Sequence, residues 1–127
     1  MLMTSAYQSM AFAHLSAGIV ELTQWQSENL LGVLKGHSAE VNRDVKQTQF
    51  ADWYYTGTDN EFDFRSQSSF LRIGVELDQL NELAQQIQQM LDIDMPLLTA
   101  IDQQMTARVN AVQLQMKKIL DYLFARI

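Results

Sequence analysis

The sequence predicts an all-α protein, and three observations lead to this prediction. Apolar residues recur at alternating spacings of three and four over long stretches, which is the period of helices with one buried face. The chain has 127 residues, 47% of them apolar, which is enough for one hydrophobic core. Helices of about 40 Å can bury such stripes only against one another. We therefore expect residues 1–127 to form a single domain, an antiparallel four-helix bundle with a short second helix and an irregular aromatic loop.

The first half of the chain predicts one long helix, one short helix and a loop. The long helix covers about Ser5 to Leu34, and its buried stripe comprises Phe12, Leu15, Ile19, Leu22, Gln26 and Val33. Gly36 is placed to end it, and Ser38 to cap a short second helix that reaches about Gln47. The aromatic stretch "QFADWYY" and the acidic "TGTDNEFDF" after it are expected to form the longest irregular connection.

The second half predicts two further long helices. The first covers Ser66 to Leu91 and has the stripe Phe70, Ile73, Leu77, Leu80, Ala84, Ile87 and Leu91. Asp94 is the expected N-cap of the last helix, with Pro96 in its first turn. The stripe of that helix comprises Leu97, Ile101, Met105, Val109, Val112, Met116, Ile119, Leu123 and Phe124.

Composition argues against several classes of function. The net charge of −6 and the pI near 4.7 argue against binding to nucleic acid or to an anionic membrane surface. The absence of cysteine excludes disulfides, thiol nucleophiles and cysteine-based zinc sites. No apolar run is long enough for a membrane span, and the N-terminal stretch lacks the features of a signal peptide. We expect a cytoplasmic protein without membrane insertion.

Candidate chemical motifs are weak. His14 and His37 lie on different predicted elements and are expected to be surface or boundary residues. Asp59, Glu61 and Asp63 alternate as in a calcium loop, but the turn glycine and the terminal glutamate are missing, so a solvated turn is favoured. The methionines are typical of core packing. No nucleophile or acid–base constellation is recognisable, so we expect no enzyme, no metal and no cofactor.

Three segments together resemble a known family. "GIVELTQW", "TQFADWYY" and "LDQLNELAQQI" are similar, in order and rough spacing, to motifs of the bacterial chemoreceptor zinc-binding (CZB) domain. The resemblance covers nearly the whole chain. It implies a four-helix bundle in which three histidines and one cysteine hold zinc beside an aromatic motif.

Each zinc ligand of the family is replaced in this chain. Leu22 stands three positions before Trp25, where the family has histidine, and Thr48 stands five before Trp53, where it has cysteine. The histidine pair of the third helix corresponds to Leu77 and Asn81, and Ala51 replaces the motif glycine. The resemblance thus implies a former zinc site, with a small-ligand pocket as one possibility. The residues expected to line it are Leu22, Trp25, Thr48, Phe50, Trp53, Leu77 and Asn81. A fully packed core, with an ordered water between Thr48 and Asn81, is the other possibility.

The family consists of regulatory modules attached to chemoreceptors or diguanylate cyclases. The resemblance therefore implies a zinc-independent sensory and dimerisation module that controls an output domain or signalling partner. A stand-alone structural or adaptor protein that binds a partner helix is the alternative. Apolar residues of the last helix beyond its stripe favour a homodimer; these are Leu98, Leu114, Leu120 and Ile127.

Overall fold

The computed structural model describes residues 2–36, 44–56, 67–90 and 92–125. Within these ranges all the regular elements are helical, as the sequence predicts. They are α1 (Leu2–Leu34), the short 3₁₀ helix η1 (Val45–Gln47), α3 (Gln49–Thr56), α4 (Ser68–Gln88) and α5 (Met95–Phe124). In the described helices, no segment is both long and apolar enough to cross a membrane.

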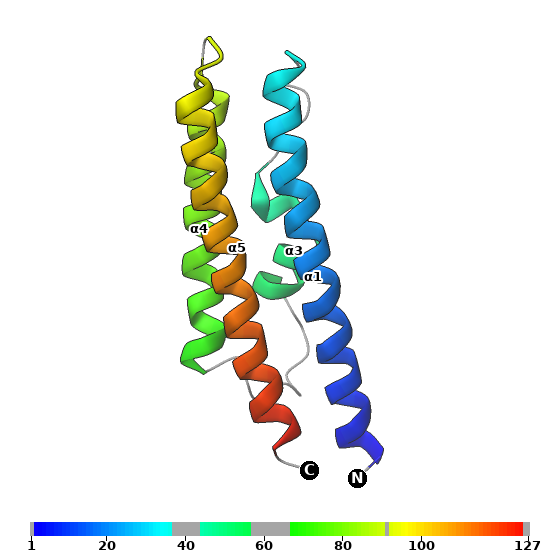
Figure 1. Ribbon diagram of the computed structural model, residues 1–127. Coiled ribbons are helices and arrows are strands. Elements are labelled where there is room, and N and C mark those ends of the chain that lie inside the picture. Colours follow the sequence, from blue (N-terminus) through cyan, green and yellow to red (C-terminus); the bar gives the residue numbers. More distant parts are fainter. Residues whose placement is uncertain (1, 37–43, 57–66, 91, 126–127) are drawn as a thin grey trace.

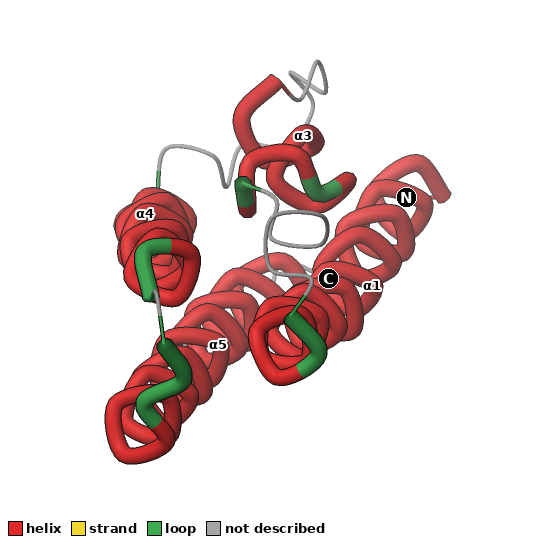
Figure 2. Tube along the Cα trace, turned by 90° about the horizontal axis from the view of Figure 1, so that it is seen from above, coloured by secondary structure: helices red, strands yellow, loops and turns green. Residues whose placement is uncertain are grey.

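Three long helices form the body of the molecule (Figure 1). The chain runs in one direction along α1 and α4 and in the opposite direction along α5. Helix α5 packs mainly against α4 and also against α1. In the end-on view, α3 packs against α1 and lies on the side of the molecule opposite α5 (Figure 2). The arrangement leaves one core between the long helices and the short segment, with η1 against α4.

The stripe predicted for α4 is confirmed wherever the structure describes it. Its described members are all buried, namely Phe70, Ile73, Leu77, Leu80, Ala84 and Ile87. Leu91 lies outside the described residues. Strict alternation of three and four makes such a stripe straightforward to predict, because its positions all face one side of the helix.

The stripe of α1 is displaced from the predicted one. Leu15, Leu22 and Val33 are buried, but Phe12 is 51% exposed. The buried face passes instead through Trp25 and Asn29, which share one side of the helix with Leu22 at spacings of three and four. Gln26 is half-buried and lies at the boundary with α5. There its amide nitrogen donates hydrogen bonds to Asp102 Oδ1 at 2.8 Å and to Thr106 Oγ1 at 2.9 Å.

The buried stripe of α5 differs from the predicted one at both ends of the helix. Asp94 caps it as predicted, accepting a hydrogen bond from the Leu97 amide at 3.1 Å. Leu98, and not Leu97, enters the core in the first turn, because Leu98 continues the spacing of Ile101 and Met105. Phe124, at the other end, is 45% exposed. The stripe from Ile101 to Ile119 is buried as predicted.

The prediction of an irregular aromatic loop is wrong for residues 49–56, which form α3. Thr48 caps this helix: its Oγ1 accepts a hydrogen bond from the Ala51 amide at 3.2 Å. Phe50 and Tyr54 lie one turn apart and are both buried, so the short helix has an apolar face of its own. A second helix was expected from Ser38 to Gln47. In the described part of this range the structure has the short 3₁₀ helix η1, and residues 37–43 lie outside the described residues. Gly36 adopts the expected positive φ, 76°, after α1.

Candidate functional site

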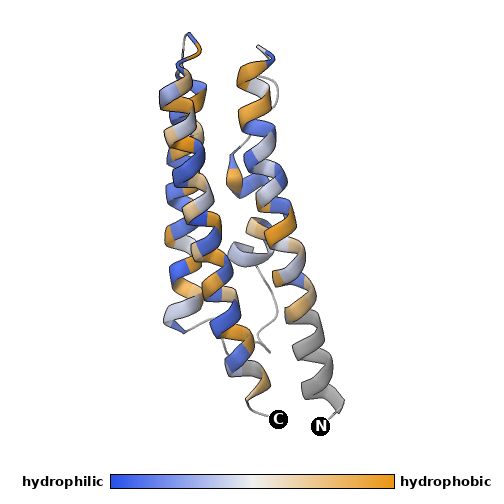
Figure 3. Cartoon of the chain, viewed as in Figure 1, coloured by the Kyte–Doolittle hydropathy of each residue, from blue (hydrophilic) through white to orange (hydrophobic). Residues whose placement is uncertain are grey.

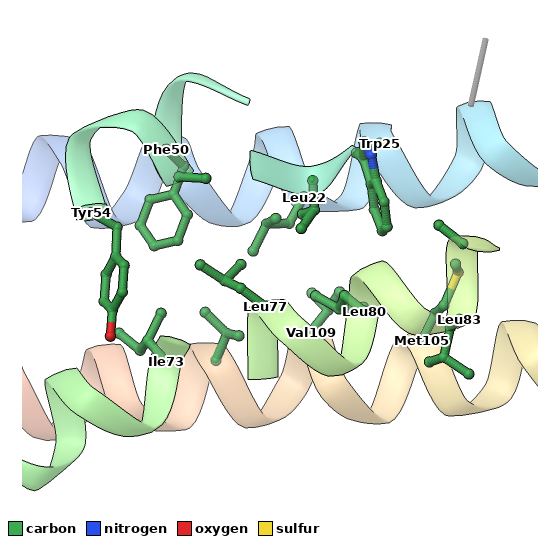
Figure 4. Close-up of a cluster of buried hydrophobic side chains, with 14 of the residues drawn as sticks. Leu22, Trp25, Phe50, Tyr54, Ile73, Leu77, Leu80, Leu83, Met105 and Val109 are labelled. Carbon is green, nitrogen blue, oxygen red and sulfur yellow. The ribbon is translucent and has the colours of Figure 1, made fainter. Parts of the chain in front are cut away.

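Two of the residues that the CZB resemblance aligns with zinc ligands lie in the centre of the core. Leu22 on α1 and Leu77 on α4 are both fully buried and point toward each other (Figure 4). Trp25, one turn along α1, is fully buried as well. Aliphatic and indole carbon atoms thus occupy the middle of the bundle, where their burial contributes about 1.5–3 kcal/mol per large side chain.

The other two residues that the resemblance aligns with zinc ligands, Thr48 and Asn81, are linked through one residue of η1. The Thr48 hydroxyl donates a hydrogen bond to the carbonyl oxygen of Val45 at 2.7 Å. The Val45 amide in turn donates to Asn81 Oδ1 at 3.2 Å. Asn81 lies one turn after Leu77 on the same helix. Leu22 and Leu77 thus face each other in the core, and Thr48 and Asn81 fix the backbone of Val45 at the start of η1.

Phe50 and Trp53 are less central than the pocket prediction requires. Phe50 is buried against Gly18 so closely that a Cβ atom at position 18 would lie 2.4 Å from the Phe50 ring. Trp53 is half-buried and stacks on the imidazole of His14, with ring centroids 4.8 Å apart and planes 10° from parallel. This stack could not be predicted from the sequence, because the spacing of the two residues carries no periodic signal.

An outer cleft of about 510 Å³ lies beside this stack, between α1 and α3. Phe50 and Trp53 line it together with His14, Glu21 and Gln49, among other residues. Neither Leu22, Leu77 nor Asn81 lines it. The seven predicted pocket residues are thus divided between the closed core and this outer cleft.

Glu21 ties α1 to the beginning of α3. Its Oε2 accepts a hydrogen bond from the Gln49 amide at 2.9 Å, and its Oε1 accepts one from the Phe50 amide at 2.7 Å. These amides belong to the first turn of α3, whose N–H groups have no partner within the helix. A carboxylate at this position also interacts favourably with the helix dipole. The role of Glu21 could not be predicted from the sequence, because its partner segment was expected to be a loop.

Tyr54 ties the other side of α3 to α4. Its hydroxyl donates a hydrogen bond to the Phe70 carbonyl oxygen and accepts one from the Gly74 amide at 2.9 Å. The tyrosine ring also stacks on Phe70, with centroids 4.4 Å apart. Gly74 leaves the space for this contact, since a Cβ atom there would lie 2.9 Å from the hydroxyl oxygen. Helix α3 is therefore anchored to α1 by Glu21 and to α4 by Tyr54.

Glu76 is a buried carboxylate between α4 and α5. It is 1% exposed and receives hydrogen bonds from Arg72 Nε at 3.0 Å and from Arg108 NH1 at 3.0 Å. The same Arg108 nitrogen donates to Gln79 Oε1 at 3.1 Å. The two guanidinium groups compensate the buried charge, which would otherwise be costly. This network positions α4 against α5 and does not involve Leu22, Thr48, Leu77 or Asn81.

Tyr55 lies on the exposed side of α3, where Lys46 Nζ is 5.6 Å from the centre of its ring. Partial burial, with further contributions from the charges of Asp78, Tyr54 and Asp44, raises the pKa of Tyr55 to about 12. The phenol is therefore neutral over the physiological range. It is suited to hydrogen bonding and stacking and not to accepting a proton.

No group of three or more histidine, cysteine, aspartate or glutamate side chains is arranged to hold a metal ion among the described residues. His14 belongs to the described part, is exposed and stacks on Trp53. His37 and the acidic residues Asp59, Glu61 and Asp63 lie outside the described residues. The leucine, threonine and asparagine side chains at positions 22, 48, 77 and 81 are not the ligands that tetrahedral zinc uses.

The apolar surface of the bundle differs from the surface expected on α5. Leu98 is buried, Leu120 packs partly against the core, and Ile127 lies outside the described residues. Of the three described residues, Leu114 alone is exposed, at 52%. Hydrophobic positions recur along both α1 and α5 (Figure 3). On α1 the exposed ones are Phe12, Val20, Leu31 and Leu34.

Comparison of the chain with protein-family models, with curated proteins and with solved structures yields no match.

Proposed function

We propose that this chain is a degenerate CZB domain, an antiparallel four-helix bundle that acts as a zinc-independent regulatory and dimerisation module of bacterial signalling. The pairing of Leu22 with Leu77 in the core, and of Thr48 with Asn81 through Val45, carries this proposal. These are the positions where the family resemblance places the zinc ligands, and they come from three separate segments. Such a module would act in the cytoplasm, joined to or bound by an output domain of the chemoreceptor or diguanylate cyclase type.

The proposed regulatory element is α3. It contacts α1 through Glu21 and α4 through Tyr54, so a displacement of α3 changes the spacing of two long helices. In a zinc-binding relative the metal would hold this region. Here the Leu22–Leu77 contact and the Val45 hydrogen bonds do so, and the module does not need a metal to keep its shape.

The proposed dimer surface is a stripe on α1. It comprises seven exposed, uncharged residues at spacings of three and four: Phe12, Ser16, Val20, Thr23, Ser27, Leu31 and Leu34. In a chain of net charge −6, an uncharged stripe allows two copies to approach without like charges meeting. Helices pack closely where small residues alternate with larger apolar ones. An adaptor that binds a partner helix would use the same stripe, but it would be a monomer in isolation.

A fusion experiment tests this function. The chain is joined to a diguanylate cyclase catalytic domain that is active only as a dimer, and sedimentation and cyclic dinucleotide synthesis are measured with and without zinc or a chelator. We expect a dimer whose activity zinc does not change. Replacing Val20 and Leu31 by glutamate should give a folded, inactive monomer, because four buried charges would face one another. The same change at the exposed Leu71 of α4 is the control and should leave the dimer intact.

Two results would contradict the proposal. The first is a monomeric, inactive fusion of the unmodified chain, which would favour the adaptor function instead. The second is an active dimer that the Val20→Glu and Leu31→Glu changes leave unaffected, which would place the contact on another surface.

A further inference from the structure

A second surface groove lies between α1 and α5. Its volume is about 590 Å³, within the range of small-molecule sites. Its lining residues come from the middle of α1 and the second half of α5. It shares only Ser16 with the uncharged stripe of α1.

The floor of this groove is apolar. Leu15 and Met116 are almost completely buried at its base, and Ile19 and Leu120 are partly buried along its sides. Leu114 forms an outer wall and is 52% exposed. Because Leu114 is a large apolar side chain that is half-exposed beside a groove of this size, an apolar ligand that covers it would be stabilised. The lining segment of α5, from 110 to 120, is about 15 Å long, which matches an extended alkyl chain of medium length.

The polar rim of the groove carries a positive charge. Ser16, Asn110 and Gln113 contribute a hydroxyl and two amides, and Lys117 contributes the only charge among the lining residues that the structure describes. Asp121, one turn further along α5, does not line the groove. In a chain with fifteen acidic and nine basic residues, a hollow whose described lining has one ammonium group and no carboxylate favours an anion.

We propose that this groove binds a medium-chain alkyl carboxylate, with the alkyl chain on Leu15, Ile19 and Met116 and the carboxylate beside Lys117. An alkyl chain of this kind matches the narrow apolar floor. The carboxylate pairs with the ammonium group at the rim, where both remain partly hydrated. Binding in this groove does not require the chain to be a dimer.

Methionine-methyl NMR of the whole chain tests the proposal with decanoate as the probe. Met116 lies in the floor of the groove, and Met105 lies in the core and serves as the internal reference. We expect the Met116 resonance to shift and saturate with decanoate, and the Met105 resonance to stay in place. Decyltrimethylammonium, which has the same chain length and the opposite charge, should bind at least tenfold more weakly.

Two neighbouring lysines provide a matched pair of variants. Lys117 and Lys118 are both exposed, but only Lys117 lines the groove. Lys117→Glu should weaken decanoate binding at least tenfold and improve binding of decyltrimethylammonium, whereas Lys118→Glu should change either affinity by less than about threefold, because its charge is not at the rim. Leu114→Asn, at an exposed position that tolerates the change, should weaken both ligands.

Other outcomes would overturn the proposal. If Lys117→Glu and Lys118→Glu weakened decanoate binding equally, the affinity would depend only on the net charge of the protein and not on the groove. Decanoate shifts spread over the core, with Met105 moving as much as Met116, would indicate non-specific binding. A Met116 resonance that does not shift with decanoate would show that the groove does not bind the ligand. If Leu114→Asn also changed the sedimentation coefficient, the groove would be a contact between protein chains.

Discussion

Single residues decide how the short segment is held against the long helices. Gly18 and Gly74 each leave room for one aromatic side chain of α3, the first for Phe50 and the second for Tyr54. Because the space is already filled, a methyl group at position 18 would force the Phe50 ring to move. In both cases a missing side chain on one helix determines where another helix can lie.

Tyr55 gives a prediction about pH. Its pKa is raised to about 12 from the ordinary value of 10, so between these values the unfolded chain loses the phenolic proton before the folded chain does. The free energy of unfolding should therefore fall as the pH rises from about 10 to 12, and the contribution is fully present below 10. Replacing Tyr55 by Phe should remove this part of the pH dependence. Urea unfolding at several alkaline pH values measures it, and absorbance of the tyrosinate gives the pKa directly.

Replacement of Tyr122 by Phe serves as the control in that titration, since Tyr122 lies on α5 and is not among the groups that raise the pKa of Tyr55. An absorbance titration in which the Tyr55→Phe difference appears near pH 10 would contradict the raised pKa.

At the scale of the element, α3 is a helix because residues outside it accept hydrogen bonds from the amides of its first turn. Eight residues are too few for a stable isolated helix. Thr48 accepts a hydrogen bond from one amide of the first turn, and Glu21 of α1 accepts hydrogen bonds from two others. The aromatic face then packs on α1 and α4. Local propensity alone did not predict this helix, because the decisive carboxylate is 28 residues away.

Removal of the Glu21 carboxylate should therefore weaken α3 selectively. We expect Glu21→Ala to lower the free energy of unfolding by about 1–2 kcal/mol, as for the loss of a helix cap. Glu21→Gln should cost less, because the amide oxygen can still accept one of the two hydrogen bonds. Chemical denaturation gives these values, and hydrogen exchange of the Gln49 and Phe50 amides shows whether the change is local.

Glu82, which is exposed on α4, is the matched control for a lost carboxylate. If Glu82→Ala and Glu21→Ala destabilise the protein equally and the Phe50 amide keeps its protection, Glu21 does not cap α3.

At the scale of the whole molecule, the core joins four positions from three segments in two pairs. The Leu22–Leu77 contact and the two hydrogen bonds of Val45 close this region with apolar packing and backbone pairing. The Glu76 network lies elsewhere, between α4 and α5, and sets the packing of these two helices. The centre of the bundle and its α4–α5 interface thus depend on different kinds of interaction.

The four positions that the resemblance aligns with zinc ligands give a prediction about zinc. The unmodified chain should not bind zinc there, whereas the combined changes Leu22→His, Thr48→Cys, Leu77→His and Asn81→His should create a tetrahedral site. The metal-free variant should be less stable because imidazoles replace buried leucines, and zinc should restore its melting temperature, since metal binding is coupled to folding. Thermal unfolding with stoichiometric zinc measures both effects.

A variant with only Leu22→His and Leu77→His is the control and should respond weakly, because two ligands do not complete the site. Tight, stoichiometric zinc binding by the unmodified chain would contradict the prediction, as would a folded quadruple variant that ignores zinc.

The sequence by itself determined the helical class, the extent of the long helices and most of their buried stripes. It did so because the three-and-four spacing from Phe70 to Ile87 and from Ile101 to Ile119 is a local property of the chain. It also determined the N-cap Asp94 and the positive φ of Gly36, which depend on neighbouring residues alone.

Only the tertiary structure decided which side of α1 is buried, that the aromatic stretch is a helix, and where the predicted pocket residues lie. Trp25 is buried where the pattern favoured Gln26, because Gln26 finds polar partners on α5. The caps of α3 and the stack of Trp53 on His14 join residues far apart in the sequence. Such contacts have no period along the chain, since they arise from the packing of helices whose relative positions are set by the core as a whole.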